Sequence, residues 1–239
     1  TKEKYIMALP TIATPTYRVT LPSNDKRIDF RPFLVKEEKL LLIALQSEDE
    51  QEIKDAIVQI LENCVHTKGL DFSTMPIFDI EYLFLQLRTK SVGEIAEPGV
   101  RCTKCDHQFQ IKIDVSKLKP KIKKDSTNRF FLDETGTLGI TMKYPSLDSS
   151  IIIGDDDNYL GVLISSIDEI FTEEEVFKSS DHTYEEMEEF VESIQTSQLD
   201  KLLEFYREMP ALEYKKKCTC PVCDNKFNIE LRGLQDFFI

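Results

Sequence analysis

Five of the six cysteines in this chain of 239 residues fall in two short clusters. Each cluster holds a C-x-x-C pair, formed by Cys102 and Cys105 in the first and by Cys220 and Cys223 in the second. Four thiolates are the ligand set of a closed tetrahedral zinc site, and zinc suits them because thiolate is a soft ligand. The sequence therefore predicts one structural zinc ion bound by these four cysteines.

The two clusters are copies of one motif. Residues Val100–Ile113 align with Cys218–Leu231 so that both cysteines, the following Asp, a Phe and an Ile coincide. Each copy predicts a C-x-x-C turn, here called a knuckle, followed by a strand with alternating apolar residues. However, 114 residues separate Cys105 from Cys220, whereas a common zinc ribbon uses about fifteen to twenty. The tertiary fold must therefore bring the knuckles together.

The same alignment argues against two further ligands. His107 aligns with Asn225, so a histidine ligand would exist in one copy only, and we expect a surface turn residue there. Cys218 aligns with Val100, which predicts an apolar strand position. A closed shell of four cysteines leaves no open coordination position, so we do not expect catalytic zinc. The alternative interpretation is that the thiols carry no metal and pack as small hydrophobic groups.

Other motifs that would carry chemistry are absent from the sequence. It contains no phosphate-binding glycine loop, no G-x-S-x-G motif and no H-E-x-x-H motif. Cys64 and His66 lie near the end of a predicted helix, where we expect a packed thiol rather than a nucleophile. No catalytic residue and no organic cofactor is predicted, and we expect the protein not to be an enzyme.

Apolar periodicity predicts an α+β fold, with helices flanking a small β region that the zinc-ribbon-like site holds together. A hairpin is expected over residues 17–31, two amphipathic helices over 34–64 and a buried helix over 79–88. A second hairpin is expected over residues 129–144, and strands again over 214–231. No apolar run approaches the roughly 20 residues of a membrane-spanning helix, so neither membrane insertion nor secretion is expected.

These patterns divide the chain into four segments. We expect a hairpin and helices in residues 1–93, a β region with the first knuckle in 94–145, an acidic helical region in 146–210, and the second knuckle with an apolar tail in 211–239, packed on 94–145. In the third segment, one helix is expected to run to Phe171. A capping box at Thr183 and Glu186 predicts the start of the next.

Charge is distributed unevenly along the chain. The formal net charge is −13, and residues 155–192 contain fourteen acidic residues against the single Lys178. This field disfavours attraction to nucleic acid or to an anionic membrane. The acidic residues from Glu173 to Glu192 allow two interpretations, a solvated helix face or a docking surface for a basic partner. We expect Asp155–Asp157 to cap a helix rather than to bind a cation.

A lysine-rich stretch at Lys117–Lys124, together with Lys215–Lys217, is the one feature that could hold nucleic acid. It contains no aromatic residue for base stacking, so a solvated connector is favoured. The alternative function that it leaves open is a zinc-ribbon regulator that binds nucleic acid through this connector.

The sequence resembles the baseplate hub proteins of T-even-type contractile-tailed phages. The resemblance runs from about Tyr17 to Phe238 and combines the paired knuckles with three strings, at Arg31–Glu38, Pro76–Ser91 and Leu231–Phe238. It implies a phage protein without enzymatic activity that helps to build the central hub of the tail baseplate, as a virion component or as an assembly factor. Only the four knuckle cysteines carry over as functional positions.

That resemblance also implies partners and location. The partners would be other baseplate hub or tail proteins, with no nucleic acid, membrane or small-molecule substrate. The protein would be found in the virion tail baseplate, in the host cytoplasm during assembly, or in both. A hub protein needs separate contact faces, and the acidic helices and the apolar C-terminal residues 234–239 are the surfaces expected to provide them.

Overall fold

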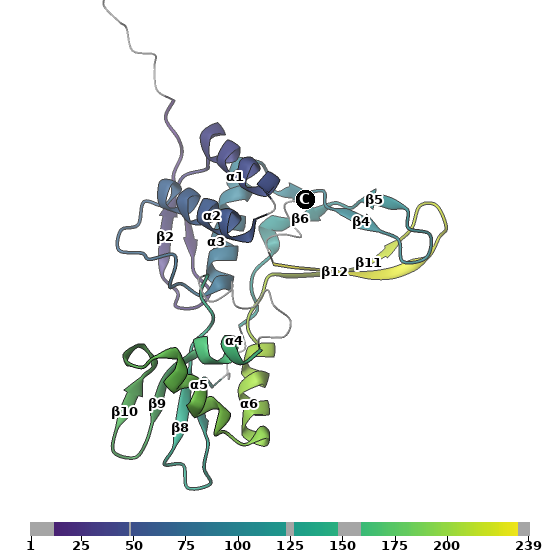
Figure 1. The fold of residues 1–239 in the computed structure, drawn as a ribbon. Coiled ribbons are helices and arrows are strands. Elements are labelled where there is room, and N and C mark those ends of the chain that lie inside the picture. Colours follow the sequence, from purple (N-terminus) through teal and green to yellow (C-terminus); the bar gives the residue numbers. More distant parts are fainter. Residues whose placement is uncertain (1–11, 48, 123–126, 148–158, 234–239) are drawn as a thin grey trace, which may run out of the picture.

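A computed structural model describes residues 12–47, 49–122, 127–147 and 159–233 of the chain. The described residues form two bodies, each with its own hydrophobic core (Figure 1). The split body consists of residues 12–122, 145–147 and 211–233, and the inserted body consists of residues 127–144 and 159–209. The chain therefore passes from the split body to the inserted body, touches the split body again at residues 145–147, and returns to it from residue 211.

The split body begins with the predicted hairpin and three helices. Strands β1 (Tyr17–Thr20) and β2 (Arg27–Phe30) pair antiparallel and are followed by α1 (Val35–Ser47), α2 (Glu50–Cys64) and α3 (Ile77–Ser91). Nine of the fifteen residues of α3 are buried, so the prediction of a buried helix is confirmed. Because α3 is apolar on several sides, it forms the centre of this core.

Two buried carboxylates fasten these elements. Glu37, at the start of α1, accepts hydrogen bonds from Arg31 at 3.0 Å and from the backbone N–H of Leu34 at 2.9 Å. Arg31 also donates to the carbonyl of Asn63 at 3.0 Å, which ties α1 to the end of α2. Asp79, in the first turn of α3, accepts from the backbone N–H and the hydroxyl of Ser23, and burial raises its pKa. Each buried carboxylate thus has the hydrogen-bond donors that its burial requires.

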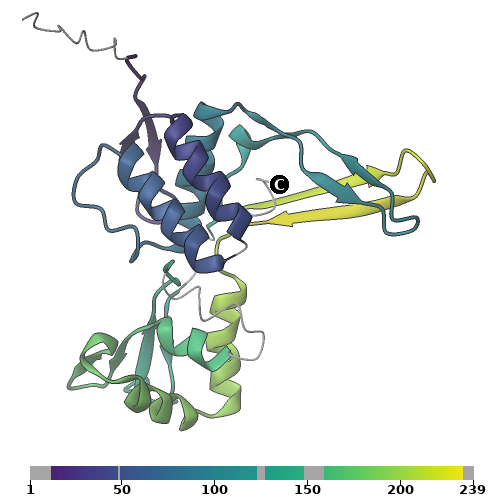
Figure 2. The same cartoon turned by 45° about the horizontal axis from the view of Figure 1, so that its top comes forward.

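Three small antiparallel sheets complete the split body. They pair β3 (Ile95–Ala96) with β6 (Ile113–Asp114), β4 (Gly99–Arg101) with β5 (Gln108–Gln110), and β11 (Glu213–Thr219) with β12 (Lys226–Arg232). A short 3-10 helix, η1 (Val115–Lys117), follows β6. The β4–β5 and β11–β12 hairpins project from the helices side by side in both views (Figures 1 and 2).

The inserted body is a four-stranded antiparallel sheet with helices packed on one face. The strands lie in the order β10–β9–β8–β7 and comprise β7 (Arg129–Phe131), β8 (Gly139–Met142), β9 (Ile167–Phe171) and β10 (Val176–Lys178). The helices are α4 (Tyr159–Ser165), the 3-10 helix η3 (Ser179–Asp181), α5 (Tyr184–Glu192) and α6 (Thr196–Arg207). The core joins Ile140 and Met142 of the sheet to Met187, Val191 and Leu202 of the helices. The capping box predicted at the start of α5 is confirmed.

Two expectations about this region differ from the structure. The hairpin β7–β8 was expected to belong to the β region of residues 94–145, but β8 pairs with β9 in the inserted body. The helix expected to run to Phe171 ends at Ser165, and residues 146–210 are only partly helical. Ile167, Ile170 and Phe171 have helical spacing but lie in a strand, opposite a register shift at Thr141 and Met142 that breaks the usual alternation of β residues.

Four features of the sequence analysis lie wholly or partly outside the described residues. They are the N-terminal residues 1–11, Lys123 and Lys124 of the lysine-rich stretch, Asp155–Asp157 and the apolar tail 234–239.

Candidate metal centre

The two knuckles have the same backbone geometry. In the first, the N–H of Cys102 donates to the carbonyl of His107 at 2.9 Å and that of Asp106 donates to Cys102 at 3.1 Å. In the second, the equivalent bonds run from Cys220 to Asn225 at 2.9 Å and from Asp224 to Cys220 at 3.1 Å. The internal repeat in the sequence is therefore a repeat in structure.

An aspartate in the left-handed backbone region closes each knuckle. Asp106 has φ 55° and Asp224 has φ 52°. This conformation is uncommon for residues other than glycine, but Asp and Asn tolerate it best. The aspartate that coincides in the two copies therefore has a local structural reason: it lets the chain turn back into β5 or β12.

The four cysteines lie together at the meeting point of the knuckles. Their sulfur atoms all lie within 4.8 Å of one another. Sγ of Cys102 is 3.7 Å from Sγ of Cys223, and Sγ of Cys105 is 3.7 Å from Sγ of Cys220, so the first cysteine of each knuckle adjoins the second cysteine of the other. Tetrahedral sulfur ligands at about 2.3 Å from zinc would be about 3.8 Å apart. The spacing thus fits a zinc ion and is far longer than the roughly 2.05 Å of a disulfide bond.

Backbone N–H groups point at the sulfur atoms in the same way in both knuckles. The N–H of Lys104 lies 3.4 Å from Sγ of Cys102, and that of Val222 lies 3.5 Å from Sγ of Cys220. Such donors stabilise a thiolate more than a thiol, and the N–H of Lys104 is the main reason that the pKa of Cys102 is lowered to about 6. A thiolate is therefore favoured at this position near neutral pH.

The second cysteine of the same knuckle is shifted the other way. The N–H of His107 lowers the pKa of Cys105, but the neighbouring sulfur atoms, that of Cys223 first, together with partial loss of hydration outweigh it and raise the pKa to about 12. Four adjacent thiols cannot all ionise without a compensating charge, because like charges at this distance repel. A divalent cation would remove that obstacle.

Burial divides the cluster into an inner and an outer half. Cys102 and Cys220 are fully buried, Cys223 is half-buried and Cys105 is exposed. The amide nitrogen of Asn225 donates to the hydroxyl of Thr103 at 3.2 Å and so links the two knuckles directly. This link was not predicted, because nothing in a pattern of spacing pairs these two residues.

Of the two residues that the alignment set aside, Cys218 lies at the apolar strand position that it predicts, whereas His107 is half-buried rather than on the surface. Cys218 pairs with Phe227 across β11–β12, as Val100 pairs with Phe109 across β4–β5. Cys218 and Val100 are both buried in the core of the split body. Phe109 and Phe227 meet edge to face with ring centroids 6.3 Å apart, so the aromatic residues of the two copies also pack together. The ring of His107 stacks on Phe109, outside the cysteine cluster.

The position of the inserted body explains the long separation between the knuckles. It lies between them in sequence, and Leu212, Cys218 and Ile229 return the chain to the core of the split body. The two knuckles therefore join the N-terminal and C-terminal parts of the split body, and the inserted body lies in the long loop between them.

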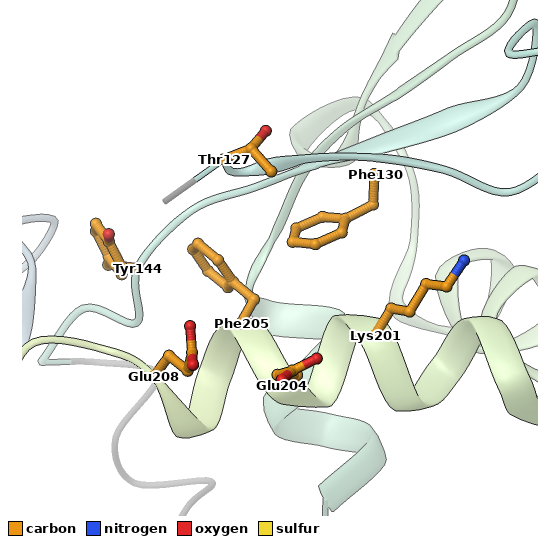
Figure 3. A pocket seen from close by; sticks show the side chains of 7 residues that line it. All are labelled: Thr127, Phe130, Tyr144, Lys201, Glu204, Phe205 and Glu208. Atoms are coloured by element: carbon orange, nitrogen blue, oxygen red, sulfur yellow. The ribbon is translucent and has the colours of Figure 1, made fainter. Parts of the chain in front are cut away.

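A seam of aromatic rings joins the two bodies. Tyr144 stacks on Phe205 with ring centroids 5.2 Å apart and meets Phe78 edge to face at 5.0 Å, while Phe130 meets Phe205 at 5.8 Å. Beside this seam is a pocket of about 270 Å³, which Lys201, Glu204 and other residues of α6 also line (Figure 3). The rings that approach each other here belong to β7, to α6 and to the segment after β8. The seam was not predicted, because its members are far apart in sequence.

The remaining candidates from the sequence have ordinary surroundings. Cys64 is fully buried at the end of α2, and burial raises its pKa to about 11, as expected for a packed thiol. In the described part of the lysine-rich stretch, Lys117 forms an ion pair with Asp114. Among the described residues, no helix is both long and apolar enough to cross a membrane.

Comparisons with known proteins gave one finding. A family model described as T4 bacteriophage base plate protein matches residues 14–239, which is nearly the whole chain. No curated protein and no solved structure gives a significant match.

Proposed function

Because the chain belongs to the T4 bacteriophage base plate protein family, we propose that it helps to build the central hub of the tail baseplate and that one structural zinc ion holds its split body together. The family membership makes it a structural protein of the phage tail baseplate that contacts other tail proteins. The hub position, the zinc ion and a role without catalysis are the parts that we add. It could act in the virion or during assembly in the host cytoplasm.

The observation that carries the zinc proposal is the repeated knuckle geometry. Cys102, Cys105, Cys220 and Cys223 would be the ligands, because their sulfur atoms have the mutual spacing of a tetrahedral site. The backbone N–H groups of Lys104 and Val222 would donate to the sulfur atoms of Cys102 and Cys220 and so stabilise their thiolate form. Four protein ligands would fill the coordination sphere, so the ion would supply structural stability and no reaction.

The size of the expected effect follows from the topology. Closing a loop of 114 residues removes about 4–5 kcal/mol of unfolded-state entropy in the cross-link model. Structural zinc sites contribute on the order of 10 kcal/mol of apparent binding free energy. Either amount is comparable with the whole stability of a domain of this size, which is typically about 5–15 kcal/mol. Zinc would therefore decide whether β11–β12 stays on the split body.

Metal content tests the ligand assignment. Zinc measured by mass spectrometry on the purified full chain should be one per chain, and Cys102→Ser and Cys220→Ser should lower it equally. Cys218→Ser is the matched control, because Cys218 neighbours Cys220 in sequence but packs in the core. A loss of zinc in Cys218→Ser with retention in Cys220→Ser would contradict the alignment of the two knuckles.

Chemical cross-linking of purified tails and of hub assembly intermediates tests the hub proposal. Cross-links from lysines of this chain to central hub proteins, insensitive to nuclease treatment, are the expected result. Cross-links only to peripheral baseplate proteins would remove the hub assignment and leave the family membership unchanged. Nuclease-sensitive association with DNA or RNA would instead favour a nucleic-acid-binding role.

A further inference from the structure

The open edge of the sheet in the inserted body carries exposed apolar residues. Val176 and Phe177, both on β10, are 59% and 37% exposed, and Tyr184 at the start of α5 is 47% exposed. Among the described residues, β10 pairs with β9 on one side and with no strand on the other. Proteins usually protect such edges, because unpaired backbone groups beside apolar side chains invite another strand. We call the surface formed by residues 173–185 the acidic edge.

The pairing register shows which backbone groups of β10 face outward. The N–H of Thr172 donates to the carbonyl of Glu175 at 2.8 Å, so the backbone groups of Glu175 point toward β9. The direction of the backbone N–H and C=O groups alternates along an antiparallel strand. The backbone groups of Phe177 therefore also point toward β9, whereas those of Val176 and Lys178 point to the open edge. An added strand would find a donor and an acceptor at each of these two residues.

Side chains on the two faces of β10 also suit an added strand. Phe177 lies in register with Ile170 and Ile140, so it ends a row of core residues at the open edge. Val176 lies in register with Phe171 on the other face of the sheet. An incoming strand would therefore extend an apolar row on each face, and burying Val176 and Phe177 would stabilise the contact.

Charge defines the partner. Residues 159–209 contain fourteen acidic residues against three basic ones, a net charge of −11. Among the described residues, one ion pair involves an acidic side chain between residues 173 and 192, namely that of Glu186 with His182 when this histidine is protonated. Glu173, Glu174 and Glu175 flank the open strand directly, and all three are exposed. A basic segment would be attracted to this edge and an acidic one repelled.

We propose that the acidic edge binds an extended, basic segment of another baseplate protein, which adds a strand to β10. Lysine or arginine side chains of the segment would face Glu173–Glu175, and its backbone would pair with Val176 and Lys178. The identity of the partner as a baseplate protein rests on the proposed function, whereas the mode of binding rests on β10 alone. The acidic segment was open to two interpretations, a solvated helix face or a docking surface for a basic partner, and this proposal favours the docking surface.

The test uses the full chain and a synthetic peptide, Lys-Val-Lys-Val-Lys-Val-Lys, with binding followed by fluorescence anisotropy. The key variant is Lys178→Pro, which removes an outward N–H, and Lys178 already has a φ of −79° that proline accepts. Lys178→Thr is the matched control, because it removes the same charge but keeps the N–H. We expect Lys178→Thr to bind at least as tightly as the unmodified chain and Lys178→Pro to bind about ten-fold more weakly.

Two results would overturn the proposal. Equal binding by the proline and threonine variants would mean that the peptide is held by charge alone. Failure of the peptide to slow hydrogen exchange at the Val176 and Lys178 amides of the unmodified chain would mean that no strand is added, and this measurement does not depend on the folding of any variant. Because the peptide experiment involves no other tail protein, its failure would leave the hub cross-linking result unaffected.

Discussion

The two bodies of this protein reach a closed core by different routes. The core of the inserted body comes from residues 127–144 and 159–209, and between these two stretches the chain touches the split body at residues 145–147. The core of the split body needs residues on both sides of that insertion, from Val19 to Val115 and again from Leu212 to Ile229, and it also takes Leu147 from within it. Only the split body carries the four-cysteine cluster. The comparison indicates that a cross-link is most useful in a body whose core combines segments far apart in the sequence.

The two bodies also differ in how many buried residues each element adds to the core. The β11–β12 hairpin is long, but its outer part projects away from the helices, and few of its residues are buried (Figure 2). Hydrophobic burial therefore anchors it at Cys218 and Ile229, and the proposed zinc ion would anchor it beyond them. In the inserted body, each of the three longer helices and β8 and β9 contribute buried residues to one core, so no cross-link is needed.

Removal of the proposed zinc ion should show the clearest difference between the two bodies. Chelation, or Cys220→Ser, should expose the amides of β4, β5, β11 and β12 to rapid hydrogen exchange, because the hairpins would lose their link. Protection of β8 and β9 should persist. The loss in unfolding free energy of the split body should be on the order of 10 kcal/mol. Equal loss of protection in both bodies would contradict a clip that serves only one of them.

Glu37→Gln tests a metal-independent fastening within the split body. Burial alone raises the pKa of Glu37, but hydrogen bonds from Arg31, the N–H of Leu34 and Lys36 outweigh it, so its pKa lies below the ordinary value of 4.5. A lowered pKa stabilises the fold above that ordinary value, and the contribution disappears as pH falls through the folded-state pKa. The variant should lose about 3 kcal/mol at neutral pH.

Denaturant unfolding at several pH values measures this effect. The difference between the parent chain and Glu37→Gln should shrink as pH drops below 4.5, because the parent carboxylate then becomes protonated. Glu38→Gln is the control, since Glu38 is exposed on the same helix. A difference that stays constant with pH would contradict the assigned role of the Arg31–Glu37 pair.

Gly139→Ala should destabilise only the inserted body. A Cβ at this position would lie 2.3 Å from the ring of Phe171 and 2.5 Å from the carbonyl of Phe130, so backbone and ring would both have to move. The expected cost is about 2 kcal/mol. Hydrogen exchange in β8 and β9 should accelerate, while exchange in α3 and zinc content stay unchanged. Gly99→Ala is the control, because its Cβ would meet no atom within 4 Å.

The smallest effect is expected at the seam between the bodies. Tyr144→Ala removes the stacking on Phe205 and the edge contact with Phe78, which are worth about 1–2 kcal/mol together. Both cores should stay folded while the relative position of the bodies becomes less restricted, as small-angle scattering would show. Tyr144→Phe should behave like the parent chain, because it keeps the ring. A rigid particle in Tyr144→Ala would mean that other contacts hold the seam.

Local patterns predicted much of the fold. The hairpin β1–β2, the buried helix α3 and the capping box at Thr183 depend on residues close in sequence, and all three were confirmed. The knuckle pair was also predictable, because an internal repeat constrains two distant segments to one geometry. In each of these cases, the residues that predict the structure lie within a few positions of it in the sequence.

The missed features depend on pairings that local patterns do not encode. Strand β9 has helical spacing of apolar residues, and its pairing with β8 and β10 makes it a strand. The seam joins Phe78, Tyr144 and Phe205 from three distant segments. Because the four-stranded sheet was not predicted, its edge strand β10 was not predicted either, and the acidic segment was interpreted as helical.

The most direct test of the zinc clip is X-ray absorption at the zinc edge on the purified full chain. Our interpretation predicts one zinc ion per chain with a first shell of four sulfur atoms at about 2.3 Å. A chain that is folded without zinc, or a shell in which nitrogen or oxygen replaces sulfur, would contradict it.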